Sequence, residues 1–117
     1  MLIDIWGDLW FGIWGAENVI RYHQSAIQEV SLRNAYPDHG VNYIFEDSRG
    51  NIWFALDRAG VVKYDGSTMQ TYRDVNGLPS NSINCIEEDL DGNIWFGSDE
   101  HGLSRLTPGN NPIIRKE

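Results

Sequence analysis

Short apolar runs alternate with glycine and polar turn residues along the whole chain. The runs are four to seven residues long and are rich in Ile, Val, Trp, Phe and Tyr. No apolar stripe with a helical period of about 3.6 residues extends over a useful length. The pattern therefore predicts short β-strands joined by tight turns.

One of these runs, together with the turn before it, occurs three times. Residues 89–97 read Asp-Leu-Asp-Gly-Asn-Ile-Trp-Phe-Gly, residues 47–55 repeat them closely, and residues 4–12 repeat them in an eroded form. Eleven of twenty aligned positions are identical between residues 41–60 and 83–102. The central tryptophans are 43 and 42 residues apart, and they are Trp10, Trp53 and Trp95. A period of about 40 residues is typical of β-propeller blades.

Each repeat contains four expected strands. In the second repeat they cover residues 41–46, 51–56, 60–64 and 69–72. In the third they cover 83–88, 93–98, 102–106 and 112–115, and in the first 1–4, 8–13, 18–22 and 26–32. The predicted fold is all-β, with three four-stranded antiparallel propeller blades. Blade one spans about residues 1–32, blade two about 41–72 and blade three about 83–115, within a single propeller domain or half-propeller over residues 1–117.

Three blades are too few for a closed propeller, which usually has four to eight. Two-fold closure is the commonest oligomer symmetry, so we expect a homodimer that closes a six-bladed propeller. The alternative is that the three blades are part of a longer propeller. The chain itself is thus an expected partner.

The expected core follows from the composition of the strands. The run Ile94-Trp95-Phe96 is continuously apolar, which is typical of a strand covered on both faces of its sheet. The three repeated tryptophans are therefore expected to be core residues wedged between blades. Cys85 lies in an apolar strand pattern and is expected to be a small buried residue.

An aspartate ends the first strand of each repeat, three residues before a glycine. These aspartates are Asp4, Asp47 and Asp89. A short carboxylate here can accept backbone N–H bonds across the turn while the glycine takes a positive φ. Calcium binding is the alternative, but it needs six to eight oxygens and one turn supplies too few.

Charge and cysteine content exclude several classes of function. The chain has nine Lys and Arg against 17 Asp and Glu, a net charge of −8, so nucleic acids and anionic lipid surfaces are poor partners. A single cysteine excludes an internal disulfide and a thiolate metal cluster. These residues contain neither a long apolar run nor a signal-peptide pattern, so a full-length chain of this sequence would be expected in the cytoplasm.

Four segments of the sequence resemble the two-component-regulator propeller repeat. They are residues 77–81, 86–89, 91–97 and 101–105. The first repeat departs from the pattern, because Trp14 stands where Asp57 and Asp99 stand in the others and residues 36–39 replace the Gly-Leu-Pro-Ser-Asn loop. The resemblance implies a propeller in the sensor region of a bacterial hybrid histidine kinase, typically periplasmic and responsive to carbohydrate. The streptogramin lyases are a weaker resemblance.

The loops on one face of the expected propeller carry the candidate ligand-binding residues. Loops on a rigid scaffold are the usual place for function, and these vary between the repeats while the strands do not. The candidates are Trp14, Tyr36, His39, Asp57, Arg58, Asn81, Asp99, Glu100 and His101. Their aromatics, carboxylates and amides would suit a sugar or polyol, a peptide, or no ligand.

Two tryptophans, Trp6 and Trp14, break the repeat at turn positions that are polar in the other units. They are expected to anchor a partner or a sugar ring. No catalytic residues, metal or cofactor are predicted, because no nucleophile motif, phosphate loop or dinucleotide fingerprint occurs. The expected function is a non-catalytic sensing or binding module. A propeller lyase and a purely structural interaction scaffold remain the alternatives.

Overall fold

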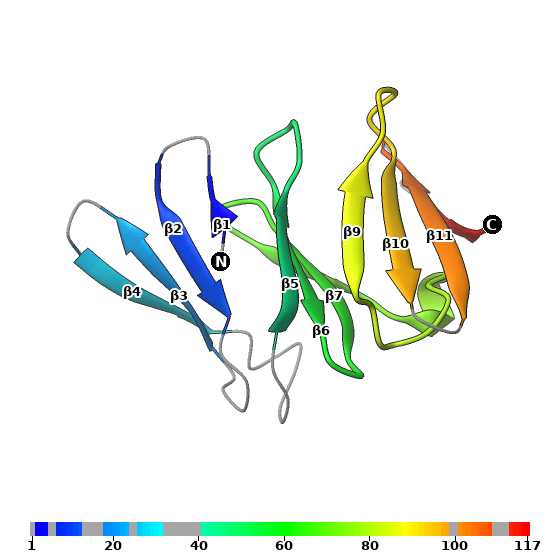
Figure 1. Ribbon diagram of the computed structural model, residues 1–117, viewed down its shortest axis with the longest axis horizontal. Helices are drawn as coiled ribbons and strands as arrows, with labels where there is room; N and C mark the ends of the chain where they lie inside the picture. Colours follow the sequence, from blue (N-terminus) through cyan, green and yellow to red (C-terminus); the bar gives the residue numbers. More distant parts are fainter. Residues whose placement is uncertain are drawn as a thin grey trace.

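The computed structural model describes residues 2–4, 7–12, 18–23, 26–31, 41–98, 101–108 and 113–117. These residues form three separate four-stranded antiparallel sheets that lie in a row (Figure 1). The strands of the first sheet are β1 (Leu2–Ile3), β2 (Leu9–Gly12), β3 (Asn18–His23) and β4 (Ala26–Ser31). Those of the second are β5 (Val41–Glu46), β6 (Ile52–Leu56), β7 (Gly60–Tyr64) and β8 (Met69–Tyr72). Those of the third are β9 (Cys85–Glu88), β10 (Ile94–Ser98), β11 (Gly102–Thr107) and β12 (Ile113–Lys116).

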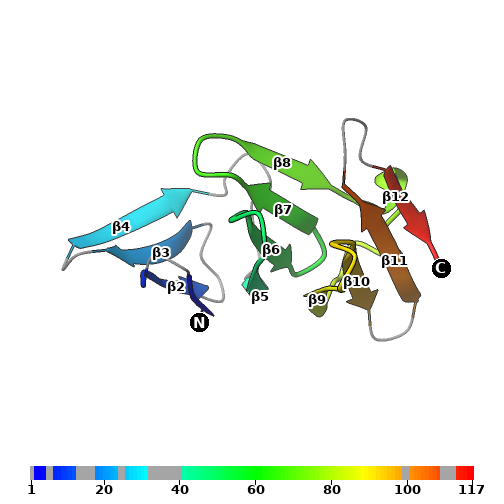
Figure 2. The same ribbon diagram turned by 90° about the horizontal axis from the view of Figure 1, so that it is seen from above.

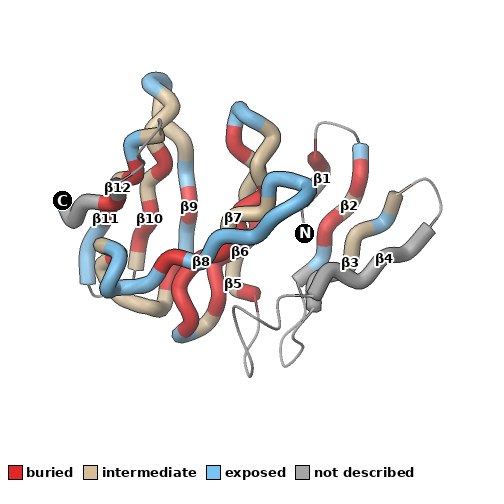
Figure 3. The backbone as a smooth tube through the Cα atoms, turned by 180° about the vertical axis from the view of Figure 1, so that it is seen from behind, coloured by how far each residue is buried: buried red, intermediate tan, exposed pale blue. Residues whose placement is uncertain are grey.

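In each sheet the strands follow one another in chain order, as a meander. The first strands of the sheets lie along one edge of the row and the last strands along the other (Figure 2). In the second sheet every residue of β6 is buried, whereas three of the four residues of β8, at the edge, are exposed (Figure 3). The all-β prediction is confirmed, and the arrangement is that of a β-propeller fragment.

The expected strand boundaries agree with the observed ones to within two residues, and those of β5, β7 and β8 coincide with them. The strand expected from Ile83 begins at Cys85 instead. Ile83 is fully buried although it lies before the ladder, so its apolar character reflects packing in the core between the second and third sheets rather than strand pairing. A single turn of 3₁₀ helix at Asp74–Asn76 was not expected from the pattern, and it ends at Gly77, which has a φ of 112°.

The repeated aspartate organises the turn between the first two strands of each sheet. Its Oδ1 accepts the backbone N–H four residues later at 2.9 Å in all three repeats. Its Oδ2 accepts the indole N–H of the repeated tryptophan six residues later. These pairs are Asp4–Trp10 at 2.9 Å, Asp47–Trp53 at 2.8 Å and Asp89–Trp95 at 2.9 Å. The turn role is confirmed, and the carboxylate also fixes the orientation of the tryptophan, which the sequence analysis did not anticipate.

The first repeat modifies this turn. Asp8 takes the position of Asn51 and Asn93, whose side-chain amides donate to the repeated aspartate. The carboxylate of Asp8 cannot donate, and it binds Arg21 at 2.6 Å and His23 at 2.5 Å instead. Burial opposes ionisation of Asp8, but the bonds from His23 and Arg21 outweigh it and hold its pKa below the usual value.

The pKa of Asp89 predicts how stability depends on pH. The hydrogen bond from the Trp95 indole is the main cause that lowers it from 3.8 to about 2. Because the folded pKa is depressed, the stabilisation is present above pH 4 and is lost as the pH falls through about 2. We expect Asp89→Asn to be less stable than wild type at pH 7, with a gap that narrows as the pH falls from about 4 towards 2.

Urea unfolding of both proteins at several pH values measures that gap. Comparing the two proteins cancels the general effect of protonating the other carboxylates. A gap that stays constant over this pH range would show that Asp89 does not titrate as described.

Two apolar cores lie between the sheets. In the first core, Trp10 packs on Phe54 and Tyr64 of the second sheet, with ring centroids 5.8 and 6.0 Å apart. In the second, Trp53 packs on Phe96 of the third sheet at 5.4 Å. Trp10 and Trp53 are each only 1% exposed, so their predicted core role is confirmed.

Two predicted core residues are not buried. Trp95 is only half-buried, because no described residue forms a fourth sheet against its face of the third sheet. Cys85 is exposed on that same face, where its Sγ lies beside Gly97. The core prediction was therefore wrong for both residues, and the reason is their place at the end of the row. Within the described residues, no helix has the length and apolar character needed to cross a membrane.

Candidate functional site

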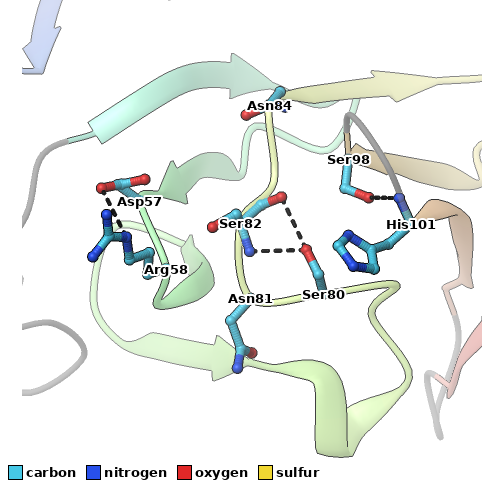
Figure 4. A pocket seen from close by; sticks show the side chains of 8 residues that line it. All are labelled: Asp57, Arg58, Ser80, Asn81, Ser82, Asn84, Ser98 and His101. Carbon is cyan, nitrogen blue, oxygen red and sulfur yellow. Dashed lines mark hydrogen bonds and ion pairs between the residues drawn. The ribbon is translucent and has the colours of Figure 1, made fainter.

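A cleft of about 530 Å³ opens between the second and third sheets. It lies where the loop from β6 to β7, the loop from β10 to β11 and the segment before β9 come together (Figure 4). The residues that line it are Asp57, Arg58, Ser80, Asn81, Ser82, Asn84, Ser98 and His101. All eight are polar or charged, so the cleft suits a hydrophilic ligand.

The wall on the second sheet is the tight turn after β6. Arg58 has a φ of 64°, in the left-handed region that residues with a side chain seldom adopt. The guanidinium Nε lies 3.9 Å from Oδ2 of Asp57, and the Arg58 side chain is 73% exposed. This weak ion pair leaves most of the guanidinium donors facing solvent at the cleft.

The segment before β9 forms the floor and is held by hydrogen bonds at several points. The Ser80 hydroxyl accepts the N–H of Ser82 and donates to its carbonyl, both at 3.1 Å. The backbone carbonyl of Asn81 accepts the N–H of Gly60 at 2.7 Å, and its Oδ1 accepts the N–H of Asp74 at 2.9 Å. The segment is thus fixed to the second sheet while the Asn81 side-chain nitrogen is left to donate.

The same segment is also tied to the third sheet. Ser104 is fully buried, and its hydroxyl donates to the carbonyl of Gly77 at 2.6 Å. The equivalent position in the second sheet holds the apolar Val62, as the pairing of β10 with β11 and of β6 with β7 shows. A polar residue at this core position therefore serves to anchor the chain that forms the floor of the cleft.

The third-sheet wall comes from the end of β10 and the loop after it. The Ser98 hydroxyl accepts the backbone N–H of His101 at 3.0 Å. The imidazole of His101 is directed towards the Ser80–Ser82 segment (Figure 4). Ser98 is therefore bound to the backbone of His101 and not to its ring, so these two residues are not arranged as a nucleophile with its base.

The structure brings together four of the predicted ligand-binding residues. Asp57, Arg58, Asn81 and His101 all line the cleft. The other candidates, with both predicted interface tryptophans, lie outside the described residues: Trp6, Trp14, Tyr36, His39, Asp99 and Glu100. The cleft thus joins loops of two neighbouring repeats, and these loops are among those that the sequence places on one face of the expected propeller.

Four lining residues were missed by the sequence analysis: Ser80, Ser82, Asn84 and Ser98. Ser98 could have been identified from the sequence, because it occupies the repeat position of the fully buried Leu56. A polar residue at a position that is apolar in the neighbouring repeat marks the edge of the cleft. The serines and Asn84 belong to a polar run before β9 that offered no comparable contrast.

Comparison with protein families matches two segments of the chain. The family model described as "Two component regulator propeller" matches residues 35–58 and 77–100. The matched segments include β5 and β6 with the Asp57–Arg58 turn, and the floor of the cleft with β9 and β10. No curated protein matches the chain.

Proposed function

We propose that this chain, in which residues 35–58 and 77–100 match the two component regulator propeller repeat, is a non-catalytic sensing module that binds a small hydrophilic ligand. The observation that carries the proposal is the all-polar cleft between two neighbouring sheets. Its placement on loops, with the sheets as a rigid frame, is the usual arrangement of a binding site on this kind of scaffold.

A carbohydrate or other polyol is the ligand class that we favour. Vicinal hydroxyls need donors and acceptors close together, and the cleft offers hydroxyls and amides beside one carboxylate and one guanidinium. A cleft of about 530 Å³ has the volume of an ordinary small-molecule site. We propose an extracytoplasmic sensor region as its setting, as the resemblance to the two-component-regulator propeller repeat implies.

Binding without catalysis is part of the proposal. Covalent catalysis by a hydroxyl needs an adjacent base within hydrogen-bond reach. The hydroxyls of Ser80 and Ser98 are both engaged with backbone groups.

Titration with a panel of neutral oligosaccharides and polyols, followed by calorimetry, tests the ligand class. We expect saturable binding that Arg58→Ala and His101→Ala each weaken about fivefold, the value of about one hydrogen bond at ~1 kcal/mol. Asp91→Asn is the control, because Asp91 lies in the turn at the opposite end of β10. No saturable binding at millimolar concentration across the panel would count against a carbohydrate sensor.

We also propose that two copies close a six-bladed propeller. The described residues of one chain form three sheets, and both end sheets carry large apolar side chains that are exposed. Exposed apolar patches of this kind mark interaction surfaces.

A further inference from the structure

The two end faces of the row are different and are each defined by a few residues. The Phe11 face is the outer face of the first sheet, made by Leu9, Phe11, Ile20 and Tyr22. The Trp95 face is the outer face of the third sheet, made by Cys85, Glu87, Trp95, Leu103 and Arg105.

The Phe11 face is exposed where the equivalent faces of the other sheets are covered. Phe11 is 36% exposed, whereas Phe54 and Phe96 at the same repeat position are fully buried. Tyr22 is 41% exposed, whereas Tyr64 at its position packs edge-on against Trp10. The side chains of the Phe11 face are therefore of the type that is buried in the second and third sheets, and they differ in that no described sheet packs against them.

The Trp95 face is likewise exposed where the equivalent face of the second sheet is covered. Leu103 is 48% exposed, whereas Val61 at the same position in the second sheet is fully buried. Trp95 keeps its indole bond to Asp89, and Arg105 lies over its ring at 5.6 Å, as Lys63 does over Trp53 at 5.8 Å. The tryptophan is thus already oriented as in an inner junction.

Both inner junctions follow one rule. The tryptophan of each sheet packs against the phenylalanine of the next sheet along the chain, in the pairs Trp10–Phe54 and Trp53–Phe96. Of the three repeated tryptophans and three repeated phenylalanines, only Trp95 and Phe11 have no partner of this kind within the described residues.

We infer that a second copy of this chain supplies the missing partner, with Trp95 of one copy seated against Phe11 and Tyr22 of the other. This gives Trp95 the two ring contacts that Trp10 makes with Phe54 and Tyr64. The inference rests on the proposed six-bladed propeller and names the contacts that close it. It does not depend on the ligand of the cleft.

Residues beside the proposed junction are consistent with a second copy of this chain as the partner. At the inner junction, the N–H and hydroxyl of Ser48 donate to the carboxylate of Glu88 at 2.7 and 2.6 Å. The repeat positions of these two residues at the closing junction are held by Leu90 and Ile3. Leu90 is completely exposed, at 107%. The sequence thus has two apolar residues at the repeat positions of this polar pair.

The junction is head-to-tail, so its symmetry decides the size of the assembly. Each copy offers one Phe11 face and one Trp95 face, and two copies satisfy both faces of each other. A head-to-tail contact that closes gives a ring, and one that does not close gives a filament. Two three-sheet arcs make six sheets, which is within the usual range for closed propellers.

Sedimentation of the full chain with variants of either face tests the inference. We expect wild type to sediment as two 13.3 kDa chains, and Phe11→Asp or Leu103→Asp to sediment as folded single chains. An equimolar mixture of the two variants retains one intact junction, because each contributes its unaltered face. The mixture should therefore recover dimers, with weaker association than wild type. Val75→Asp is the matched control, since Val75 is 88% exposed away from both faces, and it should remain a dimer.

The thiol of Cys85 gives an independent measurement on the opposite face from the mutation. It should react with Ellman's reagent faster in Phe11→Asp than in wild type at the same concentration, because Phe11 of one copy shields the Trp95 face of the other.

Wild type that sediments as a single chain at tens of micromolar, or as an open-ended series of larger assemblies, overturns the inference. So does a dimer that persists in both face variants. Ligand titration of wild type separates the two proposals. Wild type that binds ligand but sediments as a single chain overturns only the ring, and a wild-type dimer that binds no ligand overturns only the sensor proposal.

Discussion

Replacing Trp53 by alanine is expected to lower the free energy of unfolding by about 3–5 kcal/mol, the usual loss for a large buried aromatic residue. Trp53 is 1% exposed and packs on Phe96 at 5.4 Å and on Tyr72 at 5.9 Å. The substitution opens a cavity in the core between the second and third sheets. It also removes the indole donor from the buried carboxylate of Asp47.

Trp95→Ala provides the matched comparison. Trp95 has the same repeat position, the corresponding indole bond to its aspartate at 2.9 Å, and a cation over its ring, which is Arg105 where Trp53 has Lys63. Only the sheet that covers Trp53 is missing, so the loss for Trp95→Ala in a single chain should be clearly smaller. Urea unfolding of both variants, made in the Phe11→Asp background, measures the difference without any contribution from association. A loss below about 1 kcal/mol for Trp53→Ala would falsify its core role.

The contrast between Trp53 and Trp95 shows what repeat spacing can predict and what it cannot. Spacing identifies which positions are equivalent, and the aspartate–tryptophan bond is indeed the same in all three sheets. Burial depends on the neighbouring sheet, which equivalence does not specify. Cys85 was misjudged for the same reason, because it takes the place of Tyr43 on a face that no described sheet covers.

The cleft shows a similar division. Asp57, Arg58 and His101 were predicted because they lie in loops that vary between the repeats. Ser98 was missed because it counts as a strand residue, although it is at the end of β10 where the sheet meets the loop. Ser104 was missed because its hydroxyl acts on a distant carbonyl, that of Gly77, which only the folded chain brings within 2.6 Å.

Gly60 links the stability of the second sheet to the geometry of the cleft. It has a φ of 84°, and a Cβ placed on it would lie 2.0 Å from the carbonyl oxygen of Tyr72, which is far inside van der Waals contact. Its N–H donates to the carbonyl of Asn81 at 2.7 Å. Any side chain at position 60 must therefore push β8 away from β7 and shift the floor of the cleft.

Gly60→Ala is expected to cost more than about 3 kcal/mol, beyond the roughly 1–3 kcal/mol of an unfavourable positive φ alone. Gly102 is the matched control, because it has the same repeat position and a φ of 89° but open space within 4 Å of an added Cβ. Gly102→Ala should therefore show only the conformational cost, as measured by urea unfolding of both variants. Because Asn81 lies on the floor of the cleft, Gly60→Ala should also weaken ligand binding, whereas Gly102→Ala should weaken it less. Equal losses of stability for the two variants would mean that the close approach of Tyr72 to Gly60 does not constrain the sheet.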